Sequence, residues 1–302
     1  MTRKLAIVLL LGAGLALVRF LPSYPTEMLT HVLIYAIFAM SLDLLVGYTG
    51  LPSLGHSAYF GFAAYVTALL TLKLAAPFGL AAPAGLLAAV LVAAAFNLLA
   101  LRTARAYYLM ITLALSQVLW SLAVSWTELS GGDNGLPGVP RPWSLTSGTA
   151  YFYFVLAVFA ACTVAMYVIT RSPFGQALTG IRENEDRMRT LGYHTWRYKF
   201  AVSLLSAFFA GVAGLLSMYL NSFVSPAALS IALSAQVLLM ILVGGAGTLF
   251  GAIIGAALFV VLQYVISTYT ERWLFIVGAV YVLIALYTPQ GALGWIRKRR
   301  AA

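Results

Sequence analysis

Long apolar runs separated by short polar stretches make up almost the whole chain. The runs are 17 to 24 residues long, and their apolar positions do not alternate with the two-residue period of a half-buried strand. A hydrocarbon core of about 30 Å needs about 20 helical residues at a rise of about 1.5 Å per residue. The pattern therefore predicts membrane-spanning helices.

Ten segments have the length and apolarity of a spanning helix. To within a few residues they are 5–21, 29–47, 57–73, 80–101, 107–127, 151–170, 198–220, 229–247, 249–268 and 272–288. The first run follows the basic start "MTRK", but it is long for a secretory signal and lacks an obvious small-x-small cleavage site. We interpret it as an uncleaved span. The predicted fold is an all-α polytopic membrane protein, a single membrane-spanning domain over residues 1–302.

Composition supports this prediction and argues against a soluble domain. Hydrophobic residues make up 62% of the chain and charged residues 9%, whereas about a quarter of a soluble domain is charged. The outer surface must therefore face lipid, where only helices or a closed barrel satisfy the backbone polar groups. The single cysteine lies inside a predicted span, and the three histidines are far apart in the sequence. No disulfide within the chain and no metal site are predicted.

The basic residues divide unevenly between the two predicted sides. If both termini are cytoplasmic, ten spans place 14 of the 18 Lys and Arg residues inside. The positive-inside rule favours this topology. The net charge of +10 is thus a topology signal rather than a sign of nucleic-acid binding, because the charges are scattered through loops without an aromatic platform.

Two connecting loops are long. The external loop, 128–150, reads "ELSGGDNGLPGVPRPWSLTSGTA", and its glycines and prolines favour tight turns. Two interpretations stay open for it. It is either a solvated connector or an external surface on which a partner docks.

The second loop, 171–199, lies on the cytoplasmic side. Ser172 followed by Pro173 is a helix-start signal, and Gly192 is typical of a helix stop. Acid–base pairs spaced i, i+4 and a narrow apolar stripe lie between them: Glu183 with Arg187, Glu185 with Arg189, and Leu178, Ile181, Met188 and Leu191. The pattern predicts a short amphipathic helix, or a helix pair bent at Gly180. It fits either a membrane-surface anchor or insertion into a groove on a partner protein.

Two glycine-rich stretches, 47–61 and 244–255, interrupt the spanning pattern. Broken backbone at membrane depth is tolerated only where it is buried in protein or lines a cavity, and such breaks in both halves of a chain indicate a solute path. The first stretch and the acid before it supply the candidate path residues Asp43, Gly47, Tyr48, Gly50, Ser53 and His56. Structural roles compete with this hypothesis. Asp43 would bond the broken backbone of the following loop, His56 would be a buried hydrogen-bonding residue, and Gly251 and Gly255 would allow close helix packing.

The sequence shows no means of driving transport by itself. Ionisable residues are nearly absent from the spans, and the nucleotide-binding pattern GxxxxGK[ST] does not occur. No cofactor and no catalytic residue are predicted. Two other classes of membrane protein stay open: a stand-alone secondary carrier, and an intramembrane acyl- or prenyl-transferase. A transferase of this kind needs clustered acids or a Ser/His pair at one membrane face.

Four blocks of sequence together resemble a known family. They are "DLLVGYTGLPSLGHSAYFGFAAYVTALL" (43–70), "GGDNGLPGVP" (131–140), "IRENEDRMRTLGYHTWRYKFAVSLLSAFFAGVAGLL" (181–216) and "GGAGTLFGAIIGA" (244–256). In this order they are similar to the LivM-like permease subunits of the branched-chain amino acid ABC importers, in the LivH/LivM permease family. The chain departs from the commonest family pattern at Pro52.

The resemblance implies a permease in a bacterial or archaeal cell (inner) membrane. Its implied partners are a second, LivH-like permease, two cytoplasmic subunits that bind ATP, and an extracytoplasmic solute-binding protein. The family also carries urea, short amides and aromatic acids, so these remain alternative solutes. The implied ATPase-coupling residues are Arg182, Glu183, Asn184, Glu185, Asp186, Arg187, Arg189 and Gly192, and the implied binding-protein contacts are Gly132, Asp133, Asn134 and Gly135.

Overall fold

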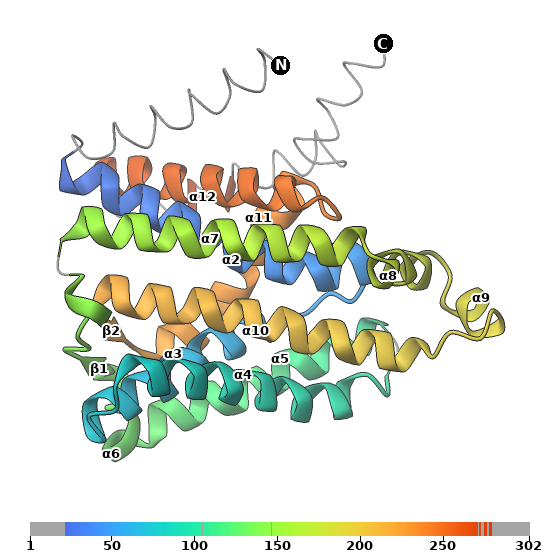
Figure 1. The fold of residues 1–302 in the computed structure, drawn as a ribbon, viewed down its shortest axis with the longest axis horizontal. Helices are drawn as coiled ribbons and strands as arrows, with labels where there is room; N and C mark the ends of the chain where they lie inside the picture. Colours follow the sequence, from blue (N-terminus) through green and yellow to red (C-terminus); the bar gives the residue numbers. More distant parts are fainter. Residues whose placement is uncertain are drawn as a thin grey trace, which may run out of the picture.

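The structure is a bundle of long helices (Figure 1). This computed structural model describes residues 22–270 apart from 104 and 146, together with residues 272, 275, 276, 278 and 279. Its helices are α2 (Ser23–Thr49), α3 (His56–Lys73), α4 (Phe78–Ala100), α5 (Arg105–Ser125), α6 (Thr127–Ser130), α7 (Gly148–Arg171), α8 (Pro173–Glu183), α9 (Glu185–Thr190), α10 (Thr195–Asn221), α11 (Ile231–Gly244) and α12 (Leu249–Tyr269). Its short elements are the 3₁₀ turns η2 (Gly132–Asn134), η3 (Pro142–Ser144) and η4 (Pro226–Leu229) and the strands β1 (Leu136–Pro137) and β2 (Phe223–Val224).

Within the described ranges, six helices are long and apolar enough to cross a membrane: α2, α4, α5, α7, α10 and α12. Helix α3 occupies a seventh predicted span, and α11 occupies part of an eighth. The predicted span 5–21 lies outside the described residues, as does most of 272–288. The count of ten spans and the side of the termini therefore stay predictions.

Helix α11 is shorter than the predicted span 229–247. Residues Pro226–Leu229 form a 3₁₀ turn, and the Ser230 side chain then caps α11 by accepting the Leu233 N–H at 3.3 Å. Gly245, at φ 108°, ends the helix. Fourteen residues give about 21 Å of helix, which is less than a hydrocarbon core of about 30 Å.

Helices α2 and α10 form the centre of the bundle. In their most apolar windows, 67% of α2 and 61% of α10 is buried within the protein, against 17% of α5. Helix α10 packs against α2, α3 and α4, and α2 also packs against α7 and α12 (Figure 1). The outer helices α4, α7 and α12 are at least as apolar as the central ones, as expected where outward faces meet lipid rather than water.

Small residues set the spacing of the helices. A Cβ added at Gly214 of α10 would lie 2.0 Å from the Phe60 carbonyl oxygen of α3, and one at Gly255 of α12 would lie 1.8 Å from the Met240 carbonyl oxygen of α11. Gly251 likewise faces the Gly244 carbonyl oxygen of α11. The close-packing interpretation of Gly251 and Gly255 is thus confirmed. Without a hydrophobic force between helices in lipid, such backbone approaches supply much of the packing energy.

The bundle has two distinct ends (Figure 1). The β1–β2 end carries the external loop of the sequence prediction, where Leu136 pairs with Val224 and Pro137 with Phe223 in an antiparallel ribbon. The α8–α9 end carries both helices of the loop predicted to be cytoplasmic, together with the last residues of α2. Alternate helices run in opposite directions between the two ends.

We expect Gly255→Ala to destabilise the folded chain, because its methyl group would meet the α11 backbone, which cannot move as a flexible side chain can. Overpacking of this kind costs about 1–3 kcal/mol of unfolding free energy. Gly79→Ala is the matched control, since a Cβ there meets nothing within 4 Å. Thermal unfolding of both detergent-purified variants measures the difference. Equal melting temperatures would contradict the close α11–α12 contact.

Candidate functional site

The two glycine-rich breaks meet at the end of α2. Asp43, which is fully buried, accepts a hydrogen bond at Oδ1 from the backbone N–H of Gly247, at 2.8 Å. A Cβ added at Gly47 would lie 2.1 Å from this Oδ1 and 2.2 Å from the Gly247 nitrogen. The sequence hypothesis had Asp43 bonding the backbone of the loop that follows α2. Asp43 does bond irregular backbone, but its partner lies in the second glycine-rich break. Asp43 and Gly247 are 204 residues apart in sequence, and their hydrogen bond joins the two breaks in one junction.

Arg182 joins this junction from outside α2. It lies in the last turn of α8, and its Nη1 donates a hydrogen bond to the Gly47 carbonyl oxygen. The same Nη1 would lie 2.9 Å from a Cβ at Gly247. Its positive charge also attracts the Asp43 carboxylate. We call Asp43, Gly47, Arg182 and Gly247 the glycine junction.

The 171–199 segment forms two helices, as one of the two sequence predictions had it. Ser172 caps α8 by accepting the Gly175 N–H at 3.4 Å, and Gly192, at φ 88°, follows the end of α9. The bend is at Asn184 and not at Gly180. Asn184 leaves helical geometry (φ −155°, ψ 100°), and its Oδ1 accepts the Arg187 N–H at 2.9 Å to start α9.

Gly180 has another role in this segment. A Cβ there would lie 2.8 Å from Met188 Sδ, so the missing side chain lets α9 fold back against α8. Because Asn184 separates the helices, Glu183 and Arg187 do not share one helix, and the i, i+4 pair predicted for them does not form. The Glu185–Arg189 pair does form, at 2.8 Å.

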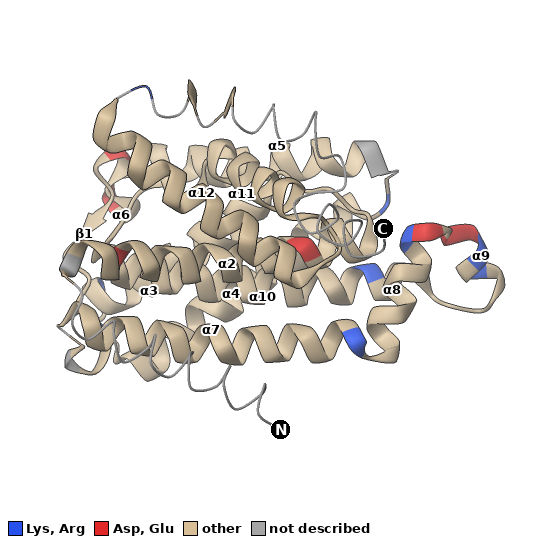
Figure 2. Cartoon of the chain, turned by 90° about the horizontal axis from the view of Figure 1, so that it is seen from above, with Lys and Arg blue, Asp and Glu red and all other residues tan. Residues whose placement is uncertain are grey.

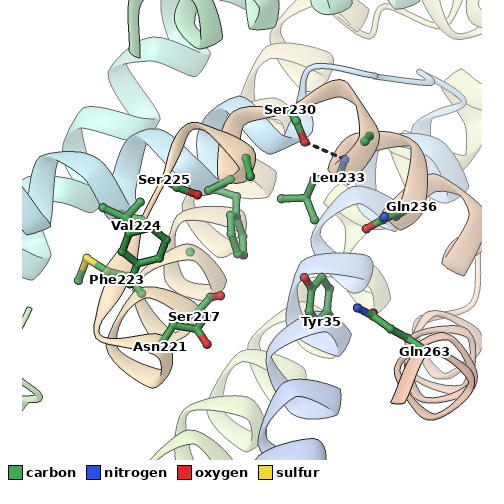
Figure 3. A pocket seen from close by; sticks show the side chains of 17 residues that line it. Tyr35, Ser217, Asn221, Phe223, Val224, Ser225, Ser230, Leu233, Gln236 and Gln263 are labelled. Atoms are coloured by element: carbon green, nitrogen blue, oxygen red, sulfur yellow. Dashed lines mark hydrogen bonds between the residues drawn. The ribbon is translucent and has the colours of Figure 1, made fainter. Parts of the chain in front are cut away.

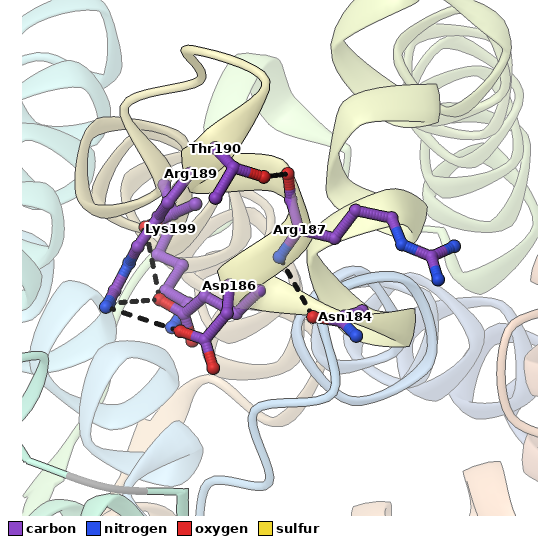
Figure 4. A network of polar contacts seen from close by, with 8 residues as sticks. Asn184, Asp186, Arg187, Arg189, Thr190 and Lys199 are labelled. Atoms are coloured by element: carbon purple, nitrogen blue, oxygen red, sulfur yellow. Dashed lines mark hydrogen bonds and ion pairs between the residues drawn. The ribbon is translucent and has the colours of Figure 1, made fainter.

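Glu185 is the centre of a polar network that fixes α9 to α10 (Figure 4). Its Oε2 contacts Lys199 Nζ at 2.5 Å, and its Oε1 accepts hydrogen bonds from Arg189 and from the Thr195 hydroxyl at 3.1 Å. Burial alone would raise the pKa of the Glu185 carboxyl, but the hydrogen bond and charge of Lys199, with Thr195 and Arg189, hold it below its ordinary value. Lys199 is only 9% exposed, so Glu185 is also the counter-charge that its burial requires.

The apolar stripe of this segment is divided between two surfaces. Leu178 and Ile181 are fully buried in the chain's own helix bundle, whereas Leu191 is 66% exposed. Neither of the two interpretations left open for the stripe, a membrane-surface anchor or insertion into a partner groove, holds for the α8 residues, because α8 packs on α2 and α7. Tyr193 and Trp196 are exposed beside Leu191, where no sequence pattern had singled them out.

The remaining path candidates lie in or beside the irregular segment between α2 and α3. Gly50, at φ 70°, ends α2, and Tyr48 is half-buried before it. Ser53 Oγ accepts the Gly55 N–H at 3.2 Å. His56 is fully buried, stacks on Phe38 and lies 2.8 Å from Ser41 Oγ through Nε2. These contacts fit the structural interpretation of His56.

The external loop has a defined backbone conformation, which both interpretations of it allow. Gly131, Gly132 and Gly135 all have φ between 57° and 76°, a region that residues with a side chain rarely adopt. These turns leave Asp133 and Asn134 exposed while Gly132 and Gly135 are buried. Arg141 then ties the loop to α10 by donating to the Tyr219 and Leu220 carbonyl oxygens at 3.1 and 2.8 Å.

A cavity of about 340 Å³ lies toward the β1–β2 end, between α2, α3, α10, α11 and α12 (Figure 3). Its polar lining consists of Tyr35, Ser217, Asn221, Ser225, Ser230, Gln236 and Gln263, and none of its 17 lining residues is charged. Sequence reasoning missed it. The available signal was Gln236 and Gln263, two of the three glutamines inside predicted spans; the third, Gln117, lies outside the cavity.

The comparisons with known proteins decide the family. The family model described as "Branched-chain amino acid transport system / permease component" matches residues 24–285. The chain belongs to this permease family. It is 31% identical over 326 residues to the high-affinity branched-chain amino acid transport system permease protein LivM of Escherichia coli, a match that covers 98% of this chain and 76% of that protein.

A more distant relative and a solved structure also match the permease. The probable branched-chain amino acid transport permease protein LivM of Methanocaldococcus jannaschii is 22% identical over 312 residues, covering 86% of this chain and 90% of that protein. PsaBC from Streptococcus pneumoniae in complex with Fab aligns with a TM-score of 0.49 and 15% identity, over 89% of this chain and 93% of that chain. The resemblance seen in the four sequence blocks is confirmed by the family match. The permease is a multi-pass membrane protein.

Within the described ranges, no group of three or more His, Cys, Asp or Glu residues is placed to hold a metal ion. Among the described acids, Asp43 is bonded by the Gly247 N–H and Glu185 by Lys199, whereas Asp133, Glu183 and Asp186 lie exposed.

We expect Glu185→Gln to loosen α9, because Lys199 would then be buried without a counter-charge. Hydrogen bonds to charged groups are worth about 1.5–3 kcal/mol, so the folded α8–α9 end should open more often. Asp186→Asn is the matched control, since the Asp186 side chain is 92% exposed and lies 3.8 Å from Arg189. The rate of tryptic cleavage at Arg187 and Arg189 measures the opening.

The same network predicts that the stability of the α8–α9 end depends on pH. Since the pKa of folded Glu185 is lowered, its contribution to stability is complete above its unfolded pKa of about 4.3 and is lost as the pH falls through the folded value. Trypsin should therefore cleave the Glu185→Gln variant faster than the parent at pH 7. The difference between the two cleavage rates should become smaller as the pH is lowered. Equal cleavage of the parent and Glu185→Gln at pH 7 would contradict the network's role.

Proposed function

We propose that this permease is the LivM-like membrane subunit of an ABC importer for branched-chain amino acids. It would act with a second, LivH-like permease, two cytoplasmic subunits that bind ATP, and an extracytoplasmic solute-binding protein, in a bacterial or archaeal cell (inner) membrane. The family description and the names of its relatives support this assignment. The absence of GxxxxGK[ST] from the sequence fits a subunit that leaves ATP binding to its partners.

The distribution of charge supports an orientation. Lys and Arg gather at the α8–α9 end (Figure 2), where the segment 171–199 alone carries six of them. The β1–β2 end carries Lys73 and Arg141. By the positive-inside rule, the α8–α9 end faces the cytoplasm and the external loop faces outward. Ten spans with both termini cytoplasmic complete this topology.

The observation that carries the proposal is the contact of Arg182 with the glycine junction. Helix α8 is buried along one side by Leu178 and Ile181, so it is firmly packed on the bundle, and its last turn reaches the Gly47 carbonyl and the Asp43 carboxylate. A displacement of α8–α9 by the ATP-binding subunits would therefore act directly on both backbone breaks. Broken segments are where a spanning helix can change direction at low cost.

The surface of this permease on which an ATP-binding subunit docks is the exposed side of α9 and the turn after it. Glu183, Asp186 and Arg187 are exposed there, beside the exposed apolar side chains of Leu191, Tyr193 and Trp196. A cleft of about 560 Å³ runs along Arg189 and residues 192–197. Apolar side chains surrounded by charges, on an end that faces water, are typical of a protein interface. Glu185 holds this surface in shape through the network of Figure 4 rather than contacting the partner.

At the opposite end, the exposed Asp133 and Asn134 are the expected contacts for the solute-binding protein. The positive φ values of Gly132 and Gly135 present them on a rigid turn, and the β1–β2 pairing fixes that turn to the end of α10. A rigid surface loses little conformational entropy on binding. The transport cycle is alternating access, with the glycine junction as the cytoplasmic gate of the solute path.

We expect Arg182→Gln to uncouple ATP hydrolysis from uptake, because a displacement of α8 would no longer be transmitted to the glycine junction. Uptake of leucine into vesicles should fall by about tenfold, the effect of losing about 1.4 kcal/mol of coupling, while the ATP-binding subunits still co-purify. Arg102→Gln, on the α4–α5 turn at the same end, is the control and should transport normally.

A second variant separates docking from coupling. Glu183→Lys combined with Asp186→Lys changes the exposed docking surface and leaves Arg182 in place, so it should lose the ATP-binding subunits during purification. If Arg182→Gln transports like the parent, the junction does not carry the coupling. If the double variant keeps both its subunits and its uptake, α9 is not the docking surface.

The orientation predicts opposite labelling of two introduced cysteines. In a Cys162→Ala background, a membrane-impermeant maleimide should label Asp133→Cys in intact cells and Arg187→Cys only after permeabilisation. Cys162 is buried within α7, so its replacement should leave the surface unchanged. Labelling of Arg187→Cys from outside would reverse the topology and remove the proposed contact with the ATP-binding subunits.

A further inference from the structure

We propose that the cavity near the β1–β2 end is a solute-binding chamber on the transport path, built for a solute of zero net charge that hydrogen-bonds at several points. This inference rests on the proposed function and names where the permease holds its solute. The chamber is lined by α2, α3, the end of α10, β2, η4, α11 and α12 (Figure 3). Its volume of about 340 Å³ lies within the usual range of small-molecule sites, about 300–1,000 Å³.

The polar lining is more than a structural need of the bundle. Within the described part of the chain, the side chains of Gln236 and Gln263 make no hydrogen bond, and the Tyr35 hydroxyl makes none either. All three point toward the same space (Figure 3). All three residues are half-buried, so their polar atoms are open to the cavity and can hydrogen-bond to water or to a solute held there.

The opposite wall offers hydroxyl and amide groups from other elements. Ser217 and Asn221 come from the last turns of α10, and Ser225 follows β2 (Figure 3). Ser230 Oγ accepts the Leu233 N–H, which leaves its own proton free to donate. Donors and acceptors therefore face the chamber from at least four elements, as recognition of a small polar solute requires.

The absence of charge in the lining sets the class of solute. A net charge moved into this chamber would lose its hydration without gaining a counter-ion, which is costly. A zwitterion has no net charge, and its ammonium and carboxylate groups can each bond to amides and hydroxyls. The chamber thus suits the zwitterion of a branched-chain amino acid or a short amide such as acetamide. It disfavours an aromatic acid, which is an anion at neutral pH.

The position of the chamber fits a path that is closed on one side. Tyr35 lies 14 residues before the end of α2, about 21 Å of helix from the α8–α9 end. The glycine junction closes α2 against the α11–α12 turn at that end. The chamber is therefore on the side of the junction from which a binding protein would deliver solute.

The first test removes the two unpaired amides. In the transporter assembled with its partner subunits, Gln236→Leu combined with Gln263→Leu should lower leucine uptake into vesicles by about tenfold or more, as expected for the loss of two hydrogen bonds to the solute. Gln117→Leu is the matched control, because it removes the same amide from α5, outside the chamber. Uptake by the double variant equal to that of Gln117→Leu would overturn the proposal.

The second test does not depend on transport. Ser217→Cys in a Cys162→Ala background should react with a water-soluble methanethiosulfonate, and leucine or acetamide should slow the reaction where benzoate does not. Protection by acetamide alone, with no leucine uptake by the parent, would support the chamber but contradict the proposed amino-acid substrate. No reaction at Ser217→Cys, no protection by any solute, or protection by benzoate would overturn the chamber as described.

Discussion

The hydrogen bond from the Gly247 N–H to the Asp43 carboxylate determines how the two halves of the structure fit together. A buried carboxylate is tolerated only when its charge is bonded, and a broken backbone in a membrane protein only when its N–H groups have partners. Here Asp43 Oδ1 and the Gly247 N–H satisfy one another, while Asp43 Oδ2 is buried without a hydrogen-bond partner among the described residues. Gly47 must lack a side chain for this contact to form. A Cβ there would lie 2.1 Å from Asp43 Oδ1 and 2.2 Å from the Gly247 nitrogen, closer than non-bonded atoms can approach. Arg182 contacts both sides of this junction, through its hydrogen bond to the Gly47 carbonyl oxygen and its approach to Gly247.

The structure of the α8–α9 end also depends on a buried charge that needs a bonded partner, here at an end of the bundle that faces water. Lys199 is nearly buried, so it needs Glu185, and Glu185 in turn orients Thr195 and Arg189. This network fixes the angle between α9 and α10, while Asn184 sets the bend between α8 and α9. The exposed charges of α9 are thus carried on a frame whose geometry depends on buried ones.

Local signals in the sequence predicted the helices well because membrane spans are long and uniformly apolar. Ser172 and Gly192 marked the limits of the amphipathic segment correctly, because caps and left-handed turns depend on neighbouring residues alone. The partner of Asp43 could not be predicted, since it lies 204 residues away. The bend was predicted at Gly180 because glycine is a weaker helix former than asparagine. In the structure Gly180 stays helical and packs against Met188, and the bend falls at Asn184. The cavity residues come from seven separate segments, and no local spacing reports such a convergence.

Helix α10 has a further consequence for the molecule as a whole. Its 27 residues run without a proline or an irregular turn for about 40 Å. Lys199, near its first residue, holds the acid of α9, and the carbonyl oxygens of Tyr219 and Leu220, near its last, hold Arg141 of the loop at the other end. One stiff rod thus fixes the distance between the two surfaces that partners would occupy, so neither surface can shift along the bundle axis without carrying the other with it.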